Sequence, residues 1–314
     1  MFPIATVVAV LDNSAEADSV LDAARAMRAT DAPSMLHMVH VVEEMPTAMR
    51  RYLFPYACFG DDHDAIVADL LDAGRLSFRQ RFEDDKSFDD RLLRVVYGRV
   101  ADRILEELQR LGPDVVVVGA SSSDHPEVGV IGKNAARLAR RSTAPVLVVR
   151  NRTQSTYKNI GVAIDLTSDS ASLLSTAIRF AHERDAKVTP IHVLPSSASL
   201  DHSSVRSKDV KALDSSTKRD LDRRFQQVLA ALKLPFPVQS DASKRIAKPM
   251  LEQGDPGERL VAASRDEAMD LLIMYRCQSS TGSGLRLGRV AEYALRYASC
   301  DVLVLPPPIQ QGED

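Results

Sequence analysis

The chain has 314 residues, of which 45% are hydrophobic and 26% are charged, and its formal net charge is −3. This length accommodates about two globular domains of ~150 residues each. The near balance of charge argues against a nucleic-acid-binding protein, and the lack of any apolar run of about 18 residues argues against a membrane span.

The cysteines and the first residues indicate a compartment. Cys58, Cys277 and Cys300 lie far apart and form no metal-binding or disulfide pattern, which is typical of free thiols in a reducing environment. Residues 1–12 lack a basic segment, and their apolar run stops at Asp12, so they predict a first strand rather than a signal peptide. We therefore expect a cytoplasmic protein.

Strands and helices are predicted to alternate through residues 1–150. Short Val-rich runs predict strands that are buried on both faces, and apolar residues spaced by three or four predict helices. The predicted strands are 4–10, 35–42, 92–97, 115–119 and 145–149, and the predicted helices are 14–30, 65–82, 101–111 and 133–141. This order predicts an α/β fold with a doubly wound, mainly parallel five-stranded sheet, which binds ligands beyond the carboxyl ends of its strands.

The same order of segments occurs twice. TVVAVLDNSAEAD, which starts at Thr6, resembles NIGVAIDLTSDSA, which starts at Asn159, and DVVVVGA resembles DLLIMYR. Three further pairs of segments match in the same order, and the offset stays between 152 and 156 residues. The sequence therefore predicts a duplicated domain. Its parts are a first domain at 1–150, a linker at 151–156, a second domain at 157–307 and a tail at 308–314.

Two longer segments interrupt the copies. Residues 43–62 contain several Met, Tyr and Phe residues, which indicates a covering loop, a lid over a ligand or a partner surface. Residues 195–218 are rich in Ser and charged residues and indicate a surface loop.

The order of motifs resembles that of the universal stress protein family. It consists of a strand ending in Asp12, a second strand MLHMVHVV, a VVVVG strand followed by a glycine-led helix, and a closing PVLVV strand. The resemblance covers nearly the whole chain, once in each copy, so the chain is similar to a tandem member. It implies the HUP, or adenine nucleotide alpha hydrolase-like, class of fold. It also implies pairing through the last strands, Val146–Val149 and Val302–Leu305, as an intrachain pseudo-dimer, with a homodimer of chains as a further expectation.

The resemblance also implies a Mg-dependent ATP site in the first domain. Members that bind ATP carry G-x2-G-x9-G-(S/T), whose backbone amides and helix N-terminus contact phosphate. Gly119 and Gly132 match the first and third glycines, whereas Ser122 and Lys133 replace the second glycine and the hydroxyl residue. The family also holds the nucleoside with an Asp after the first strand and with backbone after the second. The expected site comprises Asp12, Val41, Gly119, Ser122, Gly132, Lys133 and Asn134.

The second copy departs further from this motif. Tyr275 and Gln278 replace the first two glycines, Gly288 matches the third, and Arg289 replaces the hydroxyl residue, although Asp165 is retained. A tyrosine at the strand end would crowd the path of the phosphates. We therefore expect the second copy to have lost ATP binding and to serve as a structural partner.

Several polar residues allow two interpretations. His40 and His192 recur in the repeat, either as catalytic residues or, as their apolar surroundings favour, as hydrogen-bonded core histidines. Asp12 would either orient a ribose or metal-bound water or lie before a helix. A set of arginines would either bind an anion or nucleic acid or, as favoured, complement helix ends. That set is Arg137, Arg140, Arg141, Arg150 and Arg152.

Three hypotheses about function follow. The first is a non-enzymatic, cytoplasmic stress-response protein with a weakened nucleotide site in the first domain. The second is a slow ATPase or phosphotransfer enzyme that uses Asp12 to organise Mg²⁺. The third is a scaffold without a ligand, which contacts an unknown protein partner through residues 43–62 and 195–218. The sequence contains no G-x-S-x-G or Walker motif, which favours the first and third hypotheses over the second.

Overall fold

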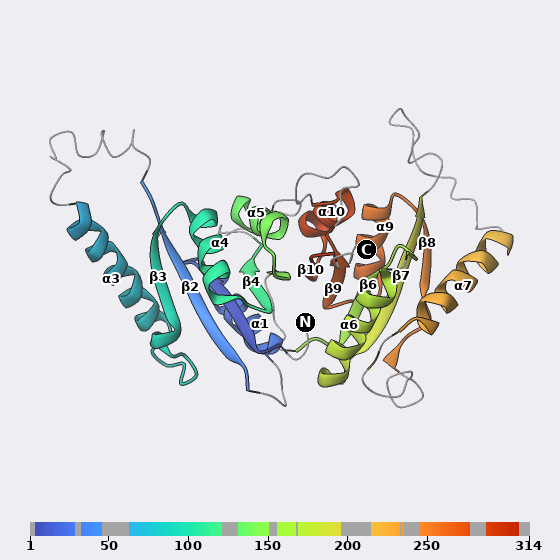
Figure 1. The fold of residues 1–314 in the computed structure, drawn as a ribbon, viewed down its shortest axis with the longest axis horizontal. Coiled ribbons are helices and arrows are strands. Elements are labelled where there is room, and N and C mark those ends of the chain that lie inside the picture. The colour runs from blue at the N-terminus through green and yellow to red at the C-terminus, as the bar shows by residue number, and fades with distance from the viewer. Residues whose placement is uncertain are drawn as a thin grey trace, which may run out of the picture.

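The computed structural model describes residues 4–28, 33–45, 63–120, 131–150, 156–167, 169–195, 215–232, 234, 245–276 and 287–307. Strands and helices alternate in both halves, as predicted (Figure 1). The first half contains β1 (Thr6–Leu11), α1 (Ala17–Met27), β2 (Met35–Glu43), α3 (His63–Arg81), η1 (Asp90–Leu92), β3 (Leu93–Gly98), α4 (Val100–Leu111), β4 (Val115–Gly119), α5 (Lys133–Arg141) and β5 (Val146–Val149). The second half contains β6 (Asn159–Ala163), α6 (Ser170–Arg184), β7 (Lys187–Pro195), α7 (Ser215–Ala230), β8 (Met250–Gly254), α9 (Pro256–Asp266), β9 (Leu271–Tyr275), α10 (Arg289–Tyr297) and β10 (Asp301–Leu305).

The strands of both halves form one ten-stranded sheet in the order β3-β2-β1-β4-β5-β10-β9-β6-β7-β8. Neighbouring strands are parallel within each half, whereas β5 and β10 run antiparallel across the middle, with Leu147 opposite Leu303. The expected pairing of the two last strands is therefore present within the chain. It joins the two predicted five-stranded sheets into one continuous sheet.

Helices cover both faces of this sheet (Figure 1). Helices α1, α3, α6 and α7 contribute to one core, and α4, α5, α9 and α10 contribute to the other. Successive side chains along each strand point to opposite faces of the sheet, so the strands contribute to both cores. Val7 and Val117 face the first core, whereas Val8 and Val116 face the second. This explains why the strand sequences are continuous apolar runs. No helix in the described ranges is long and apolar enough to cross a membrane.

Three arginines hold the two halves together at helix C-termini. The Arg184 guanidinium of α6 donates to the carbonyls of Ala26 and Met27 at the end of α1, at 2.9 and 3.1 Å. Arg276, which is 3% exposed, donates to three carbonyls at the end of α5, and Arg150 donates to the Leu295 carbonyl in α10. Cations are favourable at this end of a helix, where carbonyls lack partners within the helix.

Both ends of the linker are anchored to the same carboxylate of the second half. Asp301 accepts the Arg150 N–H at 2.9 Å and the Tyr157 hydroxyl at 2.8 Å. Tyr157 is fully buried and packs beside Phe180, with ring centroids 6.0 Å apart. The chain on each side of residues 151–155 is therefore fixed at the boundary between the halves.

The first helix is shorter than the predicted 14–30 segment. Asp12 Oδ1 accepts the Ser14 N–H at 3.0 Å, which holds the residues before α1 in a turn. At the other end, Arg28 is extended. The prediction extended past both ends because the spacing of apolar residues locates a helix but does not mark where it begins and ends.

The prediction of a surface loop over 195–218 is wrong at both boundaries. Pro195 is the last residue of β7, and α7 begins at Ser215. Leu221, Phe225 and Val228 in α7 are buried at helical spacing, so packing stabilises the helix despite its polar start. Residues 196–214, and residues 46–62 of the other long segment, lie outside the described residues.

Candidate functional site

The strand order reverses at β1, which lies between β2 and β4. In sheets of this type, ligands bind beyond the carboxyl ends of the strands at such a reversal. A cavity of about 220 Å³ lies there. Six of the seven predicted site residues line it, namely Asp12, Val41, Gly119, Gly132, Lys133 and Asn134. The seventh, Ser122, lies outside the described residues.

One hydrogen bond joins Gly132 to Ala120, the residue that follows Gly119. The Gly132 N–H donates to the Ala120 carbonyl at 2.7 Å, and the Ala120 N–H donates to the Val149 carbonyl at 2.8 Å. The start of α5 is thereby fixed against the ends of β4 and β5. Gly132 is the N-cap residue, and Lys133 is the first residue of the helix and is exposed. The unpaired N–H groups of this helix start and the ammonium together make the α5 side of the cavity electropositive.

The Asp12 carboxylate is positioned by its own turn. Its Oδ1 accepts the Ser14 N–H and hydroxyl, and the side chain is half-buried. Asp165 has the same arrangement, with Thr167 as donor through both its N–H and its hydroxyl. Partial burial works to raise the pKa of Asp165, but the hydrogen bonds from Thr167 and Ser170 outweigh it and lower that pKa. Both halves therefore place a fixed carboxylate after their first strand.

The two repeated histidines are hydrogen-bonded groups of the core. His40 Nδ1 lies 2.9 Å from the Leu11 carbonyl, and His192 Nδ1 lies 3.0 Å from the Ile164 carbonyl. The His40 ring also packs on Phe78 at 4.8 Å. Burial lowers the pKa of His40, although the Leu11 carbonyl and Asp12 oppose the shift. The favoured interpretation is confirmed for His40, which is buried, whereas His192 makes the same hydrogen bond but is half-buried.

Two further carboxylates line the cavity and were missed in the sequence. Glu16, which is 8% exposed, approaches from the start of α1, and Glu43 lies at the end of β2. The position of Glu43 directly after the apolar part of a strand was a usable signal, whereas nothing in the sequence around Glu16 pointed to the cavity. Among the described residues, no three acidic, histidine or cysteine side chains are grouped to hold a metal ion.

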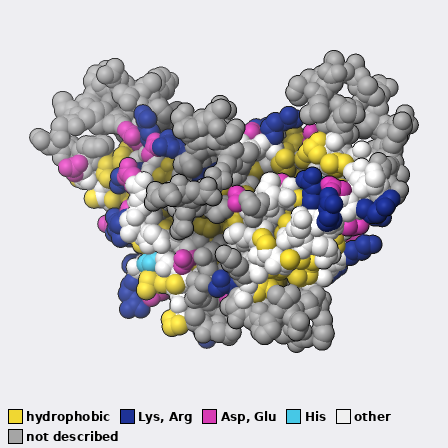
Figure 2. All heavy atoms as spheres, turned by 45° about the vertical axis from the view of Figure 1, so that its right-hand side comes forward, with side chains coloured by type: hydrophobic (Ala, Val, Ile, Leu, Met, Phe, Trp, Pro, Cys, Tyr) yellow, Lys and Arg dark blue, Asp and Glu magenta, His cyan; other side chains and the backbone are white. Residues whose placement is uncertain are grey.

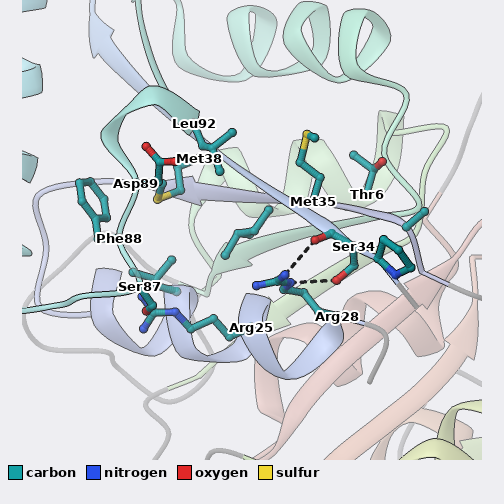
Figure 3. Close-up of a pocket in the computed structure, with 14 residues that line it drawn as sticks. Thr6, Arg25, Arg28, Ser34, Met35, Met38, Ser87, Phe88, Asp89 and Leu92 are labelled. Atoms are coloured by element: carbon teal, nitrogen blue, oxygen red, sulfur yellow. Dashed lines mark hydrogen bonds between the residues drawn. The ribbon is translucent and has the colours of Figure 1, made fainter. Parts of the chain in front are cut away.

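A larger cavity of about 680 Å³ lies at the amino ends of β1, β2 and β3. Figure 3 shows Arg28 donating hydrogen bonds to the hydroxyl and carbonyl of Ser34 in this cavity. Arg25 forms ion pairs with Asp22 and Asp85. Because its arginines are engaged and it lies at the opposite end of the strands, this cavity is a weaker candidate than the one at β1 and β4.

The fold and this site define a tandem α/β protein with a cavity at a reversal of strand order. Residues 3–150 and 156–306 each match the Universal stress protein family. The chain therefore belongs to the universal stress protein family, with two such domains in tandem.

Some of the solved structures that are similar to this protein match nearly the whole chain, and others match one half of it. A universal stress protein from Archaeoglobus fulgidus DSM 4304 is 13% identical with a TM-score of 0.66, over 97% of this chain and 99% of that chain. The functionally unknown protein PA1789 from Pseudomonas aeruginosa PAO1 is 17% identical with a TM-score of 0.62, over 97% of this chain and 93% of that chain. A universal stress protein from Archaeoglobus fulgidus in complex with dAMP is 14% identical with a TM-score of 0.31, over 48% of this chain and 98% of that chain. No curated protein sequence matches the chain.

Proposed function

We propose that this stress-response protein binds an adenine nucleotide weakly in its first domain and works as a non-enzymatic binding module in the cytoplasm. The supporting observation is the convergence of Asp12, Val41, Gly119 and the start of α5 on one cavity. These groups come from three strands and a helix that are far apart in the sequence. They meet where folds of this class bind nucleotides.

The charges around the cavity give the ligand an orientation. Asp12, Glu16 and Glu43 line the cavity from β1, α1 and β2, where carboxylates accept hydrogen bonds from hydroxyl and amino groups of a nucleoside. Lys133 and the start of α5 form the opposite side and attract phosphate. One lysine faces three carboxylates, so a bare triphosphate would bind poorly. We therefore propose that ATP binds as its Mg²⁺ complex, with the metal carried by the phosphates.

The size of the cavity fits weak binding. Sites for small molecules commonly enclose about 300–1,000 Å³. This cavity measures about 220 Å³, so it would enclose only part of a nucleotide. Partial enclosure buries less ligand surface and lowers affinity.

The second domain is proposed to have lost this site. Tyr275, which stands where the first half has Gly119, is half-buried, and its hydroxyl is hydrogen-bonded with Ser172 of α6. Ser172 is equivalent to Ser19, the neighbour of Val20, which lines the first cavity. The tyrosine ring thus fills the region that the glycine leaves open.

Thermal unfolding of nucleotide-free protein, with and without Mg·ATP or AMP, tests the proposal. A ligand at ~100 times its Kd should stabilise the protein by about 2.7 kcal/mol. Gly132→Asp should abolish this gain, because it places a carboxylate at the helix start that faces the phosphates. Asp is also a good N-cap residue, so the helix should still form.

Gly288→Asp is the matched control, since Gly288 is the N-cap residue of α10 in the second domain. It should leave the nucleotide effect intact. No stabilisation of wild type at millimolar nucleotide, or loss of the effect in both variants, would contradict the proposal. Steady ATP turnover that disappears in Asp12→Ala would instead support the enzyme hypothesis.

A further inference from the structure

A third cavity, of about 440 Å³, lies between α5 of the first half and α10 of the second. Of the described residues, five cationic side chains and one carboxylate line it. The cations are Lys133, Arg137, Arg140, Arg141 and Arg296, and the carboxylate is Glu292. We call this cavity the α5–α10 groove. Because both halves contribute to it, a lone domain would lack it.

Among the described residues, the acidic groups at this groove do not balance its cations. Glu292 pairs with Arg296 at 2.7 Å. Asp102 of α4 lies 2.6 Å from Arg137 and 3.7 Å from Arg141. Across the described ranges, no ion pair is formed by Lys133 or Arg140, and both side chains are exposed.

A buried arginine adds to the positive field behind the groove. The Arg276 guanidinium donates to the Arg140 and Ser142 carbonyls at 2.9 Å. Burial lowers its pKa, and no carboxylate of the described residues contributes to that shift. Within the described ranges, its charge is therefore stabilised by carbonyl dipoles and not by an opposite full charge. Such a field favours an anion in the groove.

Complementing the helix dipole does not account for this cluster. Arg140 and Arg141 lie in the last turn of α5, where cations are expected. Lys133, however, lies at the first turn, where a cation opposes the dipole, and Arg296 comes from the other half of the molecule. Side chains from two helices thus converge on one cavity.

The spread of the cations indicates the kind of anion. Lys133 and Arg140 are seven residues apart on one helix, which corresponds to about 10 Å at 1.5 Å per residue. A chain of phosphates spans this separation with both side chains extended, whereas a single phosphate would require both to bend toward it. Basic and acidic side chains are interspersed over the face of the molecule in Figure 2. A long nucleic acid would need a continuous basic surface, so the groove fits a short chain better.

We propose that the α5–α10 groove binds an oligophosphate chain. Arginine and lysine side chains bind phosphate oxygens by charge-assisted hydrogen bonds. The chain has two sources: free oligophosphate, or the tail of a nucleotide in the neighbouring cavity, since Lys133 lines both cavities. The site goes beyond the proposed nucleotide function, because free oligophosphate needs no nucleoside to bind.

Isothermal titration calorimetry of the full chain with tripolyphosphate tests the site. Wild type should bind, and Arg140→Glu should weaken binding by about tenfold or more. Arg265→Glu is the matched control, because Arg265 is also the penultimate residue of its helix, α9, and is exposed. It changes the net charge equally and should alter binding less than twofold. Arg296→Ala should also weaken binding, since it removes a cation and leaves Glu292 facing the groove.

The two sources give different results. Free oligophosphate should bind equally to wild type and to Asp12→Ala, which alters only the nucleotide cavity. A nucleotide tail would show as ATP binding that weakens in Arg140→Glu while AMP binding does not. Failure of AMP and ATP to bind, with tripolyphosphate still bound, would overturn the nucleotide function and leave the groove standing. No tripolyphosphate binding, equal losses in Arg140→Glu and Arg265→Glu, or tighter binding of a single-stranded oligonucleotide would overturn the groove proposal.

Discussion

The two halves of the molecule agree where the fold requires a residue and differ where a ligand would bind. Asp114 accepts the N–H groups of Ala5 and Thr6 at 2.8 and 2.9 Å. Asp270 does the same for Lys158 and Asn159, at 2.6 and 3.0 Å. Each carboxylate ties the start of one strand to its neighbour.

A pair of equivalent glycines shows the same constraint. Gly98 and Gly254 have φ values of +141° and +142°, a region that disfavours other residues. A Cβ at either position would lie 2.9 Å from an arginine side chain, Arg103 or Arg259. At the strand ends, by contrast, the first half has Gly119 where the second half has Tyr275. Residues that the fold requires are therefore the same in both halves, whereas residues at the strand ends can differ.

The largest effect is expected at the seam between the halves. Leu147→Ala and Leu303→Ala should each lower the free energy of unfolding by about 3 kcal/mol, because both side chains are at most 1% exposed and each leaves a cavity. Chemical denaturation measures this. The two residues pair across the seam, so the double variant should cost less than the sum. If one of the two substitutions lowered the free energy of unfolding much more than the other, the two halves would not contribute equally at the seam.

Arg276→Ala should be the next most severe change. It leaves buried carbonyls at the end of α5 without a donor, which costs about 2 kcal/mol. Arg276→Lys should lose less of the free energy of unfolding, measured with denaturant, than Arg276→Ala. The ammonium restores the charge but lacks the planar guanidinium with its fixed set of N–H donors. Arg265→Ala, at an exposed helix end, should stay within about 0.5 kcal/mol of wild type. If Arg276→Ala lowers the free energy of unfolding no more than Arg265→Ala does, the Arg276 contact does not stabilise the protein as predicted.

Substitutions at the two helix starts sharpen the asymmetry in binding. Lys133→Ala should raise the Kd for nucleotide or tripolyphosphate about tenfold, which corresponds to ~1.4 kcal/mol. Arg289→Ala should have little effect, because Arg289 is 78% exposed and its guanidinium already lies 3.9 Å from Asp255. Calorimetric titration of both variants decides the matter. Equal effects would contradict the asymmetry between the halves.

The smallest expected effect is a pH dependence at His40. Its pKa is lowered on folding by burial, so the unfolded chain binds its proton more readily. Its contribution to stability is complete above about pH 6.5, the ordinary pKa of histidine, and declines as the pH falls toward the lowered value. Stability measured at pH 7.5 and 5.5 should fall less in His40→Gln than in wild type. His192→Gln controls for losing the matching hydrogen bond, and an unchanged pH dependence in His40→Gln would contradict the prediction.

The fold was largely predictable because its signals are local and repeated. Val-rich runs and helical spacing located the elements of the first half, and the repeat carried them to the second. The polar start of α7 hid its buried stripe of Leu221, Phe225 and Val228. The start of α1 depended on the Asp12 turn, which the spacing of apolar residues does not reveal.

The candidate site was predictable only where a motif marked it. Glycine spacing and the strand ends pointed to the residues that line the cavity. Glu16 was missed because only the packing of α1 brings it there. The α5–α10 groove was missed because it depends on how two helices of different halves approach each other.

The antiparallel seam between β5 and β10 has a consequence for divergence. In a dimer of separate chains, a substitution that weakens the contact allows the partner to dissociate at low protein concentration. Within one chain, the linker keeps the partner at a high effective concentration that does not depend on expression level. Each half therefore always folds against the same neighbour. The residues at the strand ends of either half can then change independently of the other half. One half can keep a ligand cavity while the other serves only as its structural partner.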